Sequence, residues 1–192
     1  MKSLRFARLL TAALLAAAFA LPAAARDRTE EKRDEVRRMR DQVLAQLYDT
    51  NPGAKAAIRD AAGYAVFSNV GLNVLFASVA GGSGIVVERG RLRDTETFMN
   101  MGSAGVGLGL GVKDFRVIFV FSDRARLKDF VEKGWDFSGQ ADAAAKSDDK
   151  GAAVSGAVSA IPGVTIYQLT KNGAALQVTL QGTKYWKDRD LN

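Results

Sequence analysis

The chain contains no cysteine and no histidine among its 192 residues. Without cysteine, a disulfide framework is excluded. Without either residue, so are a Ser-His-Asp triad, a cysteine nucleophile and a zinc site of the usual nitrogen and sulfur type. We therefore expect a protein that is not an enzyme and that needs no metal and no cofactor. These absences favour a binding function over a catalytic one.

The first 25 residues have the layout of a secretory signal peptide. Lys2, Arg5 and Arg8 precede the apolar run LLTAALLAAAFAL, and small residues follow at positions 23 and 25. The run has 13 residues, too few to span a hydrocarbon core of ~30 Å comfortably, so a membrane anchor is the weaker interpretation. We expect cleavage after Ala25 and export to the periplasm, as a soluble protein or one peripheral on the membrane.

The mature part, residues 26–192, has the size of one domain. The signal segment holds three of the 27 basic residues and none of the acidic ones, so the net charge falls from +6 to +3 on cleavage. This mild basic excess only weakly favours anionic partners. No basic run is interleaved with aromatic residues, so we expect no nucleic acid partner.

Hydrophobic periodicity divides this domain into a helical part, residues 26–62, and a β-rich part, residues 63–192. Apolar residues recur at helical spacing in TEEKRDEVRRMRDQVLAQLYD, and PGAKAAIRDAA predicts a second, shorter helix with Asn51 as N-cap and Pro52 as its first residue. The apolar stripe of the first helix consists of Val36, Met39, Val43 and Leu47.

From Tyr64 onward the chain is rich in β-branched and aromatic residues punctuated by glycine. The predicted strands are YAVFSNV, NVLFASVA, GIVVE, TFMNMG, AGVGLGLGV and FRVIFVFS. One helix, RARLKDFVEK, is capped by Ser122 or Asp123 and ends at Gly134. Residues 138–160 predict a long surface loop, and the Asn-Gly in VTIYQLTKNGAALQVTLQ predicts a hairpin. The expected fold is α+β, dominated by an antiparallel, strongly curved or barrel-like sheet.

The stretch GSAGVGLGLGV raises the question of a phosphate-binding loop. It lacks the dinucleotide-binding spacing, and no Gly-Lys dipeptide of a P-loop occurs in the chain. Its period of two instead fits a strand with one apolar face and one bare face. The bare face either lets another element of the protein approach closely or lines a groove for a flat or chain-like ligand such as an acyl tail. The alternating glycines are Gly105, Gly107, Gly109 and Gly111.

Several stretches of the sequence resemble, in order, successive blocks of the SYLF-domain family. They are GYAVFSNVG, GGSGIVV and MGSAGVGLGLGVKDFRVIFVFSDRARLKDF, and ALQVTLQGTKYW is similar to the closing strand of the family. The resemblance implies a lipid-binding module. Eukaryotic relatives bind phosphoinositides and anionic membranes, partly through an amphipathic N-terminal helix, one yeast branch binds and bundles actin, and bacterial relatives are exported. The segments RLRDTETFMN and AAAKSDDKGA depart from the family pattern. Because export removes actin and phosphoinositides as partners, only anionic lipid binding is carried over.

Three basic groups are candidates for that lipid contact. Arg33, Arg37 and Arg40 flank the apolar stripe of the first helix, as in a helix lying in a membrane interface. The alternative is a helix packed on its own sheet, with Asp34–Arg38 and Arg37–Asp41 as ordinary ion pairs between residues four apart.

The second group is Arg89, Arg91 and Arg93 in ERGRLR, at a predicted hairpin turn around Gly90. The third is Lys184 and Lys187 beside Trp186, a combination that resembles an interfacial anchor. Either group can equally be solvated surface, and at roughly 1 kcal/mol per cation only several acting together give useful binding.

The sequence therefore predicts non-catalytic binding of anionic phospholipid or a membrane surface. The alternative is a periplasmic interaction or envelope-stress protein that docks a protein partner through its glycine-rich sheet. A calcium site at KSDDKG is disfavoured, because the segment lacks the alternating oxygen ligands and the closing Glu of an EF-hand loop.

Overall fold

The computed structural model describes residues 3–74, 77–106, 115–137, 157–170, 173–174 and 183–192. A long N-terminal helix, α1 (Ser3–Thr50), is followed by a short helix, α2 (Gly53–Asp60), and then by a sheet that is interrupted by α3 (Arg124–Lys133). The strands are β1 (Gly63–Val74), β2 (Ala77–Glu88), β3 (Thr95–Val106), β4 (Phe115–Phe121), β5 (Trp135–Asp136), β6 (Ala157–Ile161), β7 (Val164–Thr170), β8 (Gly173–Ala174) and β9 (Thr183–Lys187).

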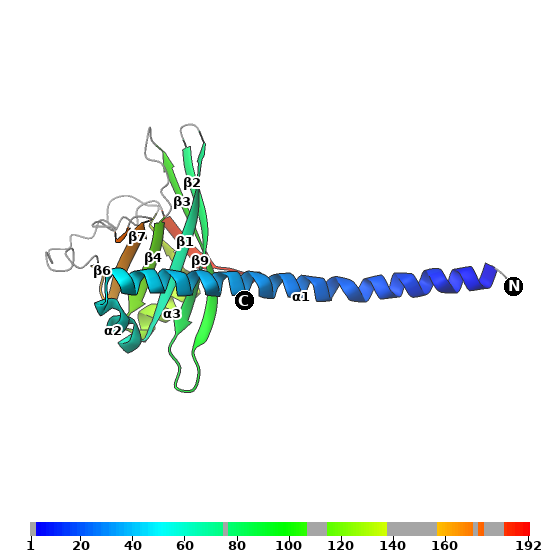
Figure 1. Ribbon diagram of the computed structural model, residues 1–192, viewed down its shortest axis with the longest axis horizontal. Coiled ribbons are helices and arrows are strands. Elements are labelled where there is room, and N and C mark those ends of the chain that lie inside the picture. Colours follow the sequence, from blue (N-terminus) through cyan, green and yellow to red (C-terminus); the bar gives the residue numbers. More distant parts are fainter. Residues whose placement is uncertain (1–2, 75–76, 107–114, 138–156, 171–172, 175–182) are drawn as a thin grey trace.

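The strands form one antiparallel sheet with the order β5-β9-β3-β2-β1-β4-β7-β6, and β8 pairs with β7. The sheet is strongly curved, and the long hairpins β1–β2 and β2–β3 form its middle (Figure 1). The prediction of an α+β fold built on a curved antiparallel sheet is therefore confirmed.

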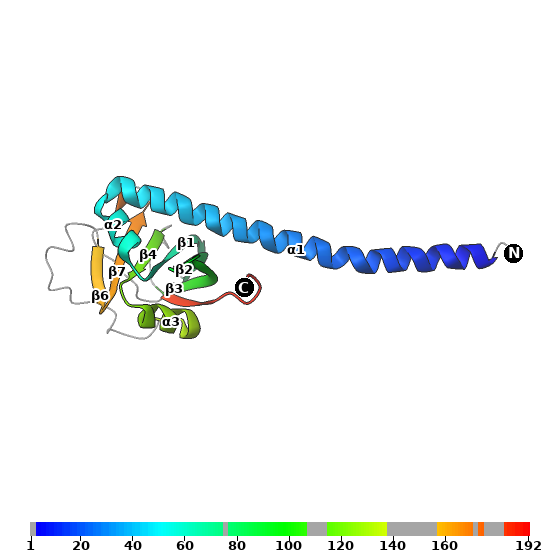
Figure 2. The same ribbon diagram turned by 90° about the horizontal axis from the view of Figure 1, so that it is seen from below.

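Helices cover part of each face of the sheet. Figure 2 shows α1 and α2 on one face and α3 on the other. Because successive side chains of a strand point to opposite faces, Tyr64 and Val66 of β1 pack with α1 and α2, whereas Ala65 and Phe67 pack with α3. The sheet therefore has a hydrophobic core on each side. Because both faces are buried there, the sequences of β1 and β4 are nearly continuously apolar.

The core beneath α3 is aromatic. Phe67 and Tyr185 have ring centroids 4.8 Å apart at an interplanar angle of 65°, and Phe130 and Trp135 have centroids 4.6 Å apart. Such tilted and edge-on pairs contribute about 0.5–1.5 kcal/mol each beyond their buried area. The cluster of aromatic side chains comprises Phe67, Phe119, Phe121, Phe130, Trp135, Phe137 and Tyr185.

The ends of the two short helices follow local chemistry. Asp123, one of the two predicted caps, accepts a hydrogen bond from the Ala125 amide at 2.8 Å, and Gly134 ends α3 with φ +70° as predicted. The start of α2 was predicted one residue too early. The Asn51 amide still donates to the Leu47 carbonyl at the end of α1, so Pro52 takes the N-cap position and α2 begins at Gly53.

Two strand predictions were wrong in their boundaries. The segment 73–80, read as one strand, contains the end of β1 and the start of β2, and residues 97–106, read as parts of two strands, are continuous in β3. The connection between β1 and β2 lies in the apolar run NVLFASVA, which contains no glycine or proline. Elsewhere the strands were cut at glycines, which interrupt the apolar pattern of a strand although pairing continues through them. Gly81 and Gly82, for example, both pair within the β1–β2 hairpin.

The predicted surface loop and the predicted terminal hairpin have different outcomes. Residues 157–160 of the predicted loop belong to β6, in which Ala157 and Val158 pair with Tyr167 and Ile166 of β7. Residues 138–156, with Asp148 and Asp149, lie outside the described residues. The hairpin is confirmed, because Thr170 pairs with Gly173 and Leu169 with Ala174.

The N-terminal part of α1 extends beyond the sheet (Figure 1). In the described part of the chain, no helix contains a stretch long and apolar enough to span a membrane. The signal peptide and its cleavage after Ala25 stay predictions. From Val36 onward α1 lies on the sheet, with Val36, Val43 and Leu47 at most 5% exposed.

Candidate functional site

The arginines of α1 are bound to the sheet through Glu96 of β3. Arg37 donates through Nε to Glu96 Oε2 at 2.9 Å, and Arg40 donates through Nη1 to Glu96 Oε1 at 2.8 Å. Arg37 also pairs with Glu30 and Asp34. These hydrogen bonds to Glu30, Glu96 and Asp34 raise the pKa of the Arg37 guanidinium above its already high ordinary value.

Arg33 is bound to the C-terminal segment. Its Nε donates to the Leu191 carbonyl at 2.9 Å and its Nη1 pairs with Glu30 at 3.0 Å. The guanidinium groups of Arg33 and Arg37 lie 5.9 and 5.5 Å from the centroid of the Phe98 ring, which is buried. Close contact of a guanidinium with an aromatic face is favourable. Arg33 therefore fastens α1 to both β3 and the end of the chain.

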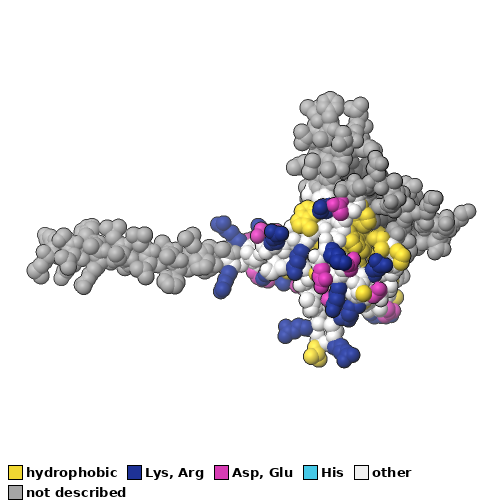
Figure 3. Space-filling view, turned by 180° about the vertical axis from the view of Figure 1, so that it is seen from behind, with side chains coloured by type: hydrophobic (Ala, Val, Ile, Leu, Met, Phe, Trp, Pro, Cys, Tyr) yellow, Lys and Arg dark blue, Asp and Glu magenta, His cyan; other side chains and the backbone are white. Residues whose placement is uncertain are grey.

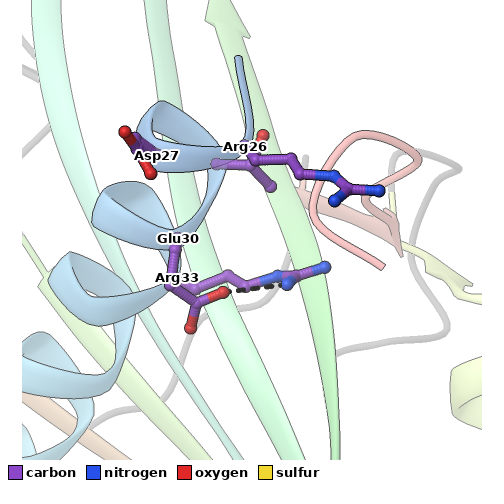
Figure 4. A pocket seen from close by; sticks show the side chains of 5 residues that line it. Arg26, Asp27, Glu30 and Arg33 are labelled. Atoms are coloured by element: carbon purple, nitrogen blue, oxygen red, sulfur yellow. Dashed lines mark hydrogen bonds and ion pairs between the residues drawn. The ribbon is translucent and has the colours of Figure 1, made fainter. Parts of the chain in front are cut away.

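An open pocket lies beside this contact, on the part of α1 that begins at Arg26. Figure 4 shows Arg26 and Arg33 extending to the same side of the helix, Asp27 pointing away, and Glu30 paired with Arg33. Positive and negative side chains are interleaved here, so the pocket has no strong preference for one sign of charge.

These contacts match the interpretation of α1 as a helix packed on its own sheet. The predicted pairs were wrong in detail: in the structure Asp34 pairs with Arg37 and Asp41 with Arg40, rather than with residues four apart. Glu96 and Phe98 had not been identified as partners from the sequence. Their spacing of two, which puts both on one face of an extended strand, is the signal that could have found them.

The second basic group lies at the β2–β3 hairpin, whose position is confirmed by the pairing of Glu88 with Thr95. Asp94 fixes its base, because one carboxylate oxygen pairs with Arg89 at 2.9 Å and the other accepts from the Gly90 amide at 3.2 Å. A Cβ at Gly90 would lie 1.9 Å from the Arg93 carbonyl oxygen. The base of the hairpin is therefore closely packed around Gly90.

Residues 91–93, called the hairpin tip below, project from that base. Leu92 is fully exposed at 101%, and the flanking Arg91 and Arg93 form no ion pair with any described residue. In the space-filling view the tip is a narrow projection on which basic side chains flank a hydrophobic one (Figure 3). The sequence prediction included the arginines and missed Leu92, although an apolar residue at the centre of a polar turn was a visible signal.

The third group lies on β9, which pairs with β3 on the side away from β2. Lys184 pairs with Asp136 of β5 at 3.0 Å, whereas Trp186 is 41% exposed. Trp186 and Lys187 line an open pocket that Glu132 and Asp188 also line. Its charges are mixed. The three predicted groups thus lie at separate places rather than forming one basic surface.

The glycine-rich strand is described only at its start. Gly105 lies in β3 and pairs with Ser78, while Gly107, Gly109 and Gly111 lie outside the described residues. Gly84 in the neighbouring β2 shows what a bare face does in this sheet: a Cβ there would lie 2.1 Å from the Phe67 ring. At that position the bare face accommodates the aromatic core. Docking of a partner or ligand on residues 105–111 stays a prediction.

Another open pocket, of about 420 Å³, lies between the end of α1, α2 and the base of the β2–β3 hairpin. Its polar lining consists of Tyr48, Lys55, Arg59 and Arg89, and its apolar lining includes the buried Ile58. The described residues contain no group of three or more Asp, Glu, His or Cys that could hold a metal ion.

No family model matches the chain. The chain is similar to Beta cell expansion factor A from Aeromonas veronii, with 32% identity over 164 residues. The match covers 84% of this chain but only 59% of the relative. The chain therefore spans less than two thirds of the relative's length, and most of the chain is similar to part of a longer protein.

Proposed function

We propose that the chain is an exported SYLF-type domain that binds anionic phospholipid at a membrane surface without catalysing a reaction. The ordered sequence blocks that resemble the SYLF family support the type of domain. The curved α+β sheet is compatible with it. The membrane contact is assigned to the hairpin tip, because that is where apolar and basic side chains are exposed together.

The exposure of Leu92 between Arg91 and Arg93 carries this proposal. A peripheral membrane protein needs an apolar group that enters the interface and cations that meet the anionic headgroups. Burying a leucine side chain is worth about 1.5–3 kcal/mol, and each arginine near an anionic surface about 1 kcal/mol. Three adjacent residues thus supply a few kcal/mol at one point of the surface.

The arginines of α1 are less suited to the same task. Arg40 is only 17% exposed at its side chain, and both Arg37 and Arg40 donate to Glu96. Moving them to lipid headgroups would separate them from that carboxylate and expose the apolar stripe of α1. The hairpin tip can meet a membrane with the fold unchanged.

Liposome co-sedimentation tests the proposal, using the protein purified after export and phosphatidylcholine vesicles with or without phosphatidylglycerol. Arg91→Gln with Arg93→Gln should weaken binding to phosphatidylglycerol vesicles about 30-fold, the equivalent of about 2 kcal/mol. The matched control is Lys32→Gln with Arg38→Gln, which removes the same charge from exposed positions on α1.

Equal loss of binding in both double variants would mean that net charge alone governs the association. Equal pelleting with both kinds of vesicle, or none with either, would overturn the proposal. In that case the protein-partner alternative would be tested next. Charge reversal of Arg33, Arg37 and Arg40 that abolishes a cellular phenotype with vesicle binding unchanged would favour it.

A further inference from the structure

The charged residues that line the pocket between α1, α2 and the hairpin base are all basic, and two of them pair with carboxylates outside the lining. Lys55, Arg59 and Arg89 line it together with the Tyr48 hydroxyl side chain, and no lining residue is acidic. Its volume of about 420 Å³ falls in the range of about 300–1,000 Å³ that is typical of small-molecule sites. A concave surface with charges of one sign concentrates ligands of the opposite sign.

Its cations retain donors for a ligand. Lys55 forms no ion pair with any described residue. Arg59 pairs with Asp60 through Nε and Nη2, and Arg89 pairs with Asp94 through Nη1. A guanidinium has five N–H donors, so neither arginine is saturated. The Arg89 Nε has no hydrogen-bond partner within the described structure, but it is fully buried, so a ligand in the open pocket would contact the other nitrogens of Arg89.

Tyr48 adds a neutral donor. Burial raises the pKa of its phenol, and the nearby charge of Arg89 only partly offsets this effect. The hydroxyl therefore stays protonated at neutral pH and can donate a hydrogen bond. The Arg89 guanidinium lies 5.6 Å from the centroid of the Tyr64 ring. This contact with the aromatic ring helps to hold the guanidinium beside the pocket.

We propose that this pocket binds a phosphate group. Phosphate offers several oxygen acceptors, which match an ammonium, two guanidinium groups and a hydroxyl approaching from α1, α2 and the hairpin.

The position of the pocket identifies a lipid headgroup as one source of that phosphate, and this part of the inference rests on the proposed membrane function. Leu92 follows Arg89 by three residues, a distance of at most about 10 Å at ~3.3 Å per residue. The headgroup layer of one leaflet is about 5–8 Å thick. When Leu92 reaches the hydrocarbon boundary, Arg89 lies within about 10 Å of it, in or just above the layer of about 5–8 Å that holds the lipid phosphates. The other source is a soluble phosphate compound.

Two ligand arms distinguish these sources. In one, isothermal titration calorimetry measures saturable binding of glycerol 3-phosphate and of inorganic phosphate to the exported protein. In the other, co-sedimentation measures binding to phosphatidylglycerol vesicles. Tyr48→Phe removes one hydroxyl and no charge, so it should weaken binding in either arm about three- to tenfold, the effect of one hydrogen bond. Lys55→Gln should weaken it further, and the exposed Lys32→Gln is its matched control.

Circular dichroism and the melting temperature verify that each variant is folded. Saturable glycerol 3-phosphate binding that is weakened by Tyr48→Phe and unaffected by the tip variant supports the pocket even if vesicle binding fails. Vesicle binding that needs the tip but is unaffected by Tyr48→Phe and Lys55→Gln, with no saturable phosphate binding, overturns the pocket and leaves the membrane function intact.

Discussion

Glu96 is the single acceptor that joins two arginines of α1 to β3. Its two carboxylate oxygens receive one hydrogen bond each, from Arg37 at 2.9 Å and from Arg40 at 2.8 Å. The Glu96 side chain is 29% exposed and that of Arg40 17%, so this ion pair is partly shielded from water. Partial burial makes such a carboxylate harder to replace than a surface one.

We expect Glu96→Gln to lower the free energy of unfolding by about 1–2 kcal/mol, because it leaves Arg40 partly buried without its charged acceptor. Urea unfolding followed by circular dichroism measures the change. Asp41→Asn is the control: Asp41 also contacts Arg40 but is 66% exposed, so it should cost about 0.5 kcal/mol or less. Equal effects of the two variants would show that Glu96 does not anchor α1.

Tyr185 differs from Glu96 in that its polar atom, the hydroxyl oxygen, is buried without a hydrogen-bond partner in the described structure. Burial strongly raises the pKa of this hydroxyl. Enclosing an unpaired hydroxyl costs about 1–3 kcal/mol. Tyr185→Phe should therefore stabilise the fold by about 1 kcal/mol and raise the melting temperature by about 2–4 °C. A lower melting temperature would contradict this prediction.

At the scale of elements, α1 is held by its own acidic residues as well as by the sheet. Glu30 receives hydrogen bonds from Arg37 and Arg33, and these lower the pKa of its carboxyl group below the ordinary value of 4.5. A lowered pKa in the folded state means that Glu30 contributes its stability fully above about pH 4.5. The contribution is lost as the pH falls through the lowered folded value.

We therefore expect Glu30→Gln to reduce the dependence of stability on pH in the acid range. Below pH 4.5 the wild type should lose stability more steeply than the variant as the pH falls. The melting temperatures of the two proteins should converge at the lowest pH. Melting temperatures measured across this range provide the readout. Parallel curves for the two proteins would show that the Glu30 pairs do not persist in solution.

The N-terminus of mature α1 is a second prediction at this scale. Cleavage after Ala25 would make Arg26 the first residue and leave Asp27, Glu30 and Glu31 near the new helix start. Acidic residues near a helix N-terminus interact favourably with its dipole. Mass spectrometry of the exported protein should give an N-terminus at Arg26. The remaining part of α1 should still be helical, which circular dichroism measures. A mass that includes residues 1–25 would contradict the signal-peptide prediction.

On the scale of the whole molecule, helices cover part of each face of the sheet and the hairpin tip projects beyond them (Figures 1 and 2). Where helices cover the sheet, its two faces carry the two hydrophobic cores and are not available to a membrane. The proposed contact is therefore a small one at one end of the molecule. Binding through it should be weak and responsive to salt.

Salt separates the apolar part of the contact from the charged part. Raising the ionic strength from about 0.1 to 1 M shortens the Debye length from about 10 to 3 Å. Wild-type binding to phosphatidylglycerol vesicles should weaken over this range, and Arg91→Gln with Arg93→Gln should reduce that dependence. Leu92→Ser should weaken binding at every salt concentration. Identical salt slopes for wild type and the arginine variant would rule out the tip as the charged contact.

Local patterns determined much of this protein. The helical stripe of α1, the cap and stop of α3, the Asn-Gly hairpin and the antiparallel α+β class follow from spacing and turn chemistry, which act between residues close in sequence. The strand ends within residues 73–80 were misread, because the chain passes from β1 to β2 in an apolar run that contains no glycine or proline.

Only the tertiary structure decided what each charged residue contacts. Arg37 and Glu96 lie 59 residues apart in the chain and 2.9 Å apart in space, so no local pattern could show that this arginine is paired while Arg91 is not. Ion pairs depend on which elements become neighbours in the fold. The local sequence pattern shows where the arginines are, but not which carboxylates they contact. For the same reason, Tyr48 and Arg89 meet at one pocket only after α1 has packed against the sheet.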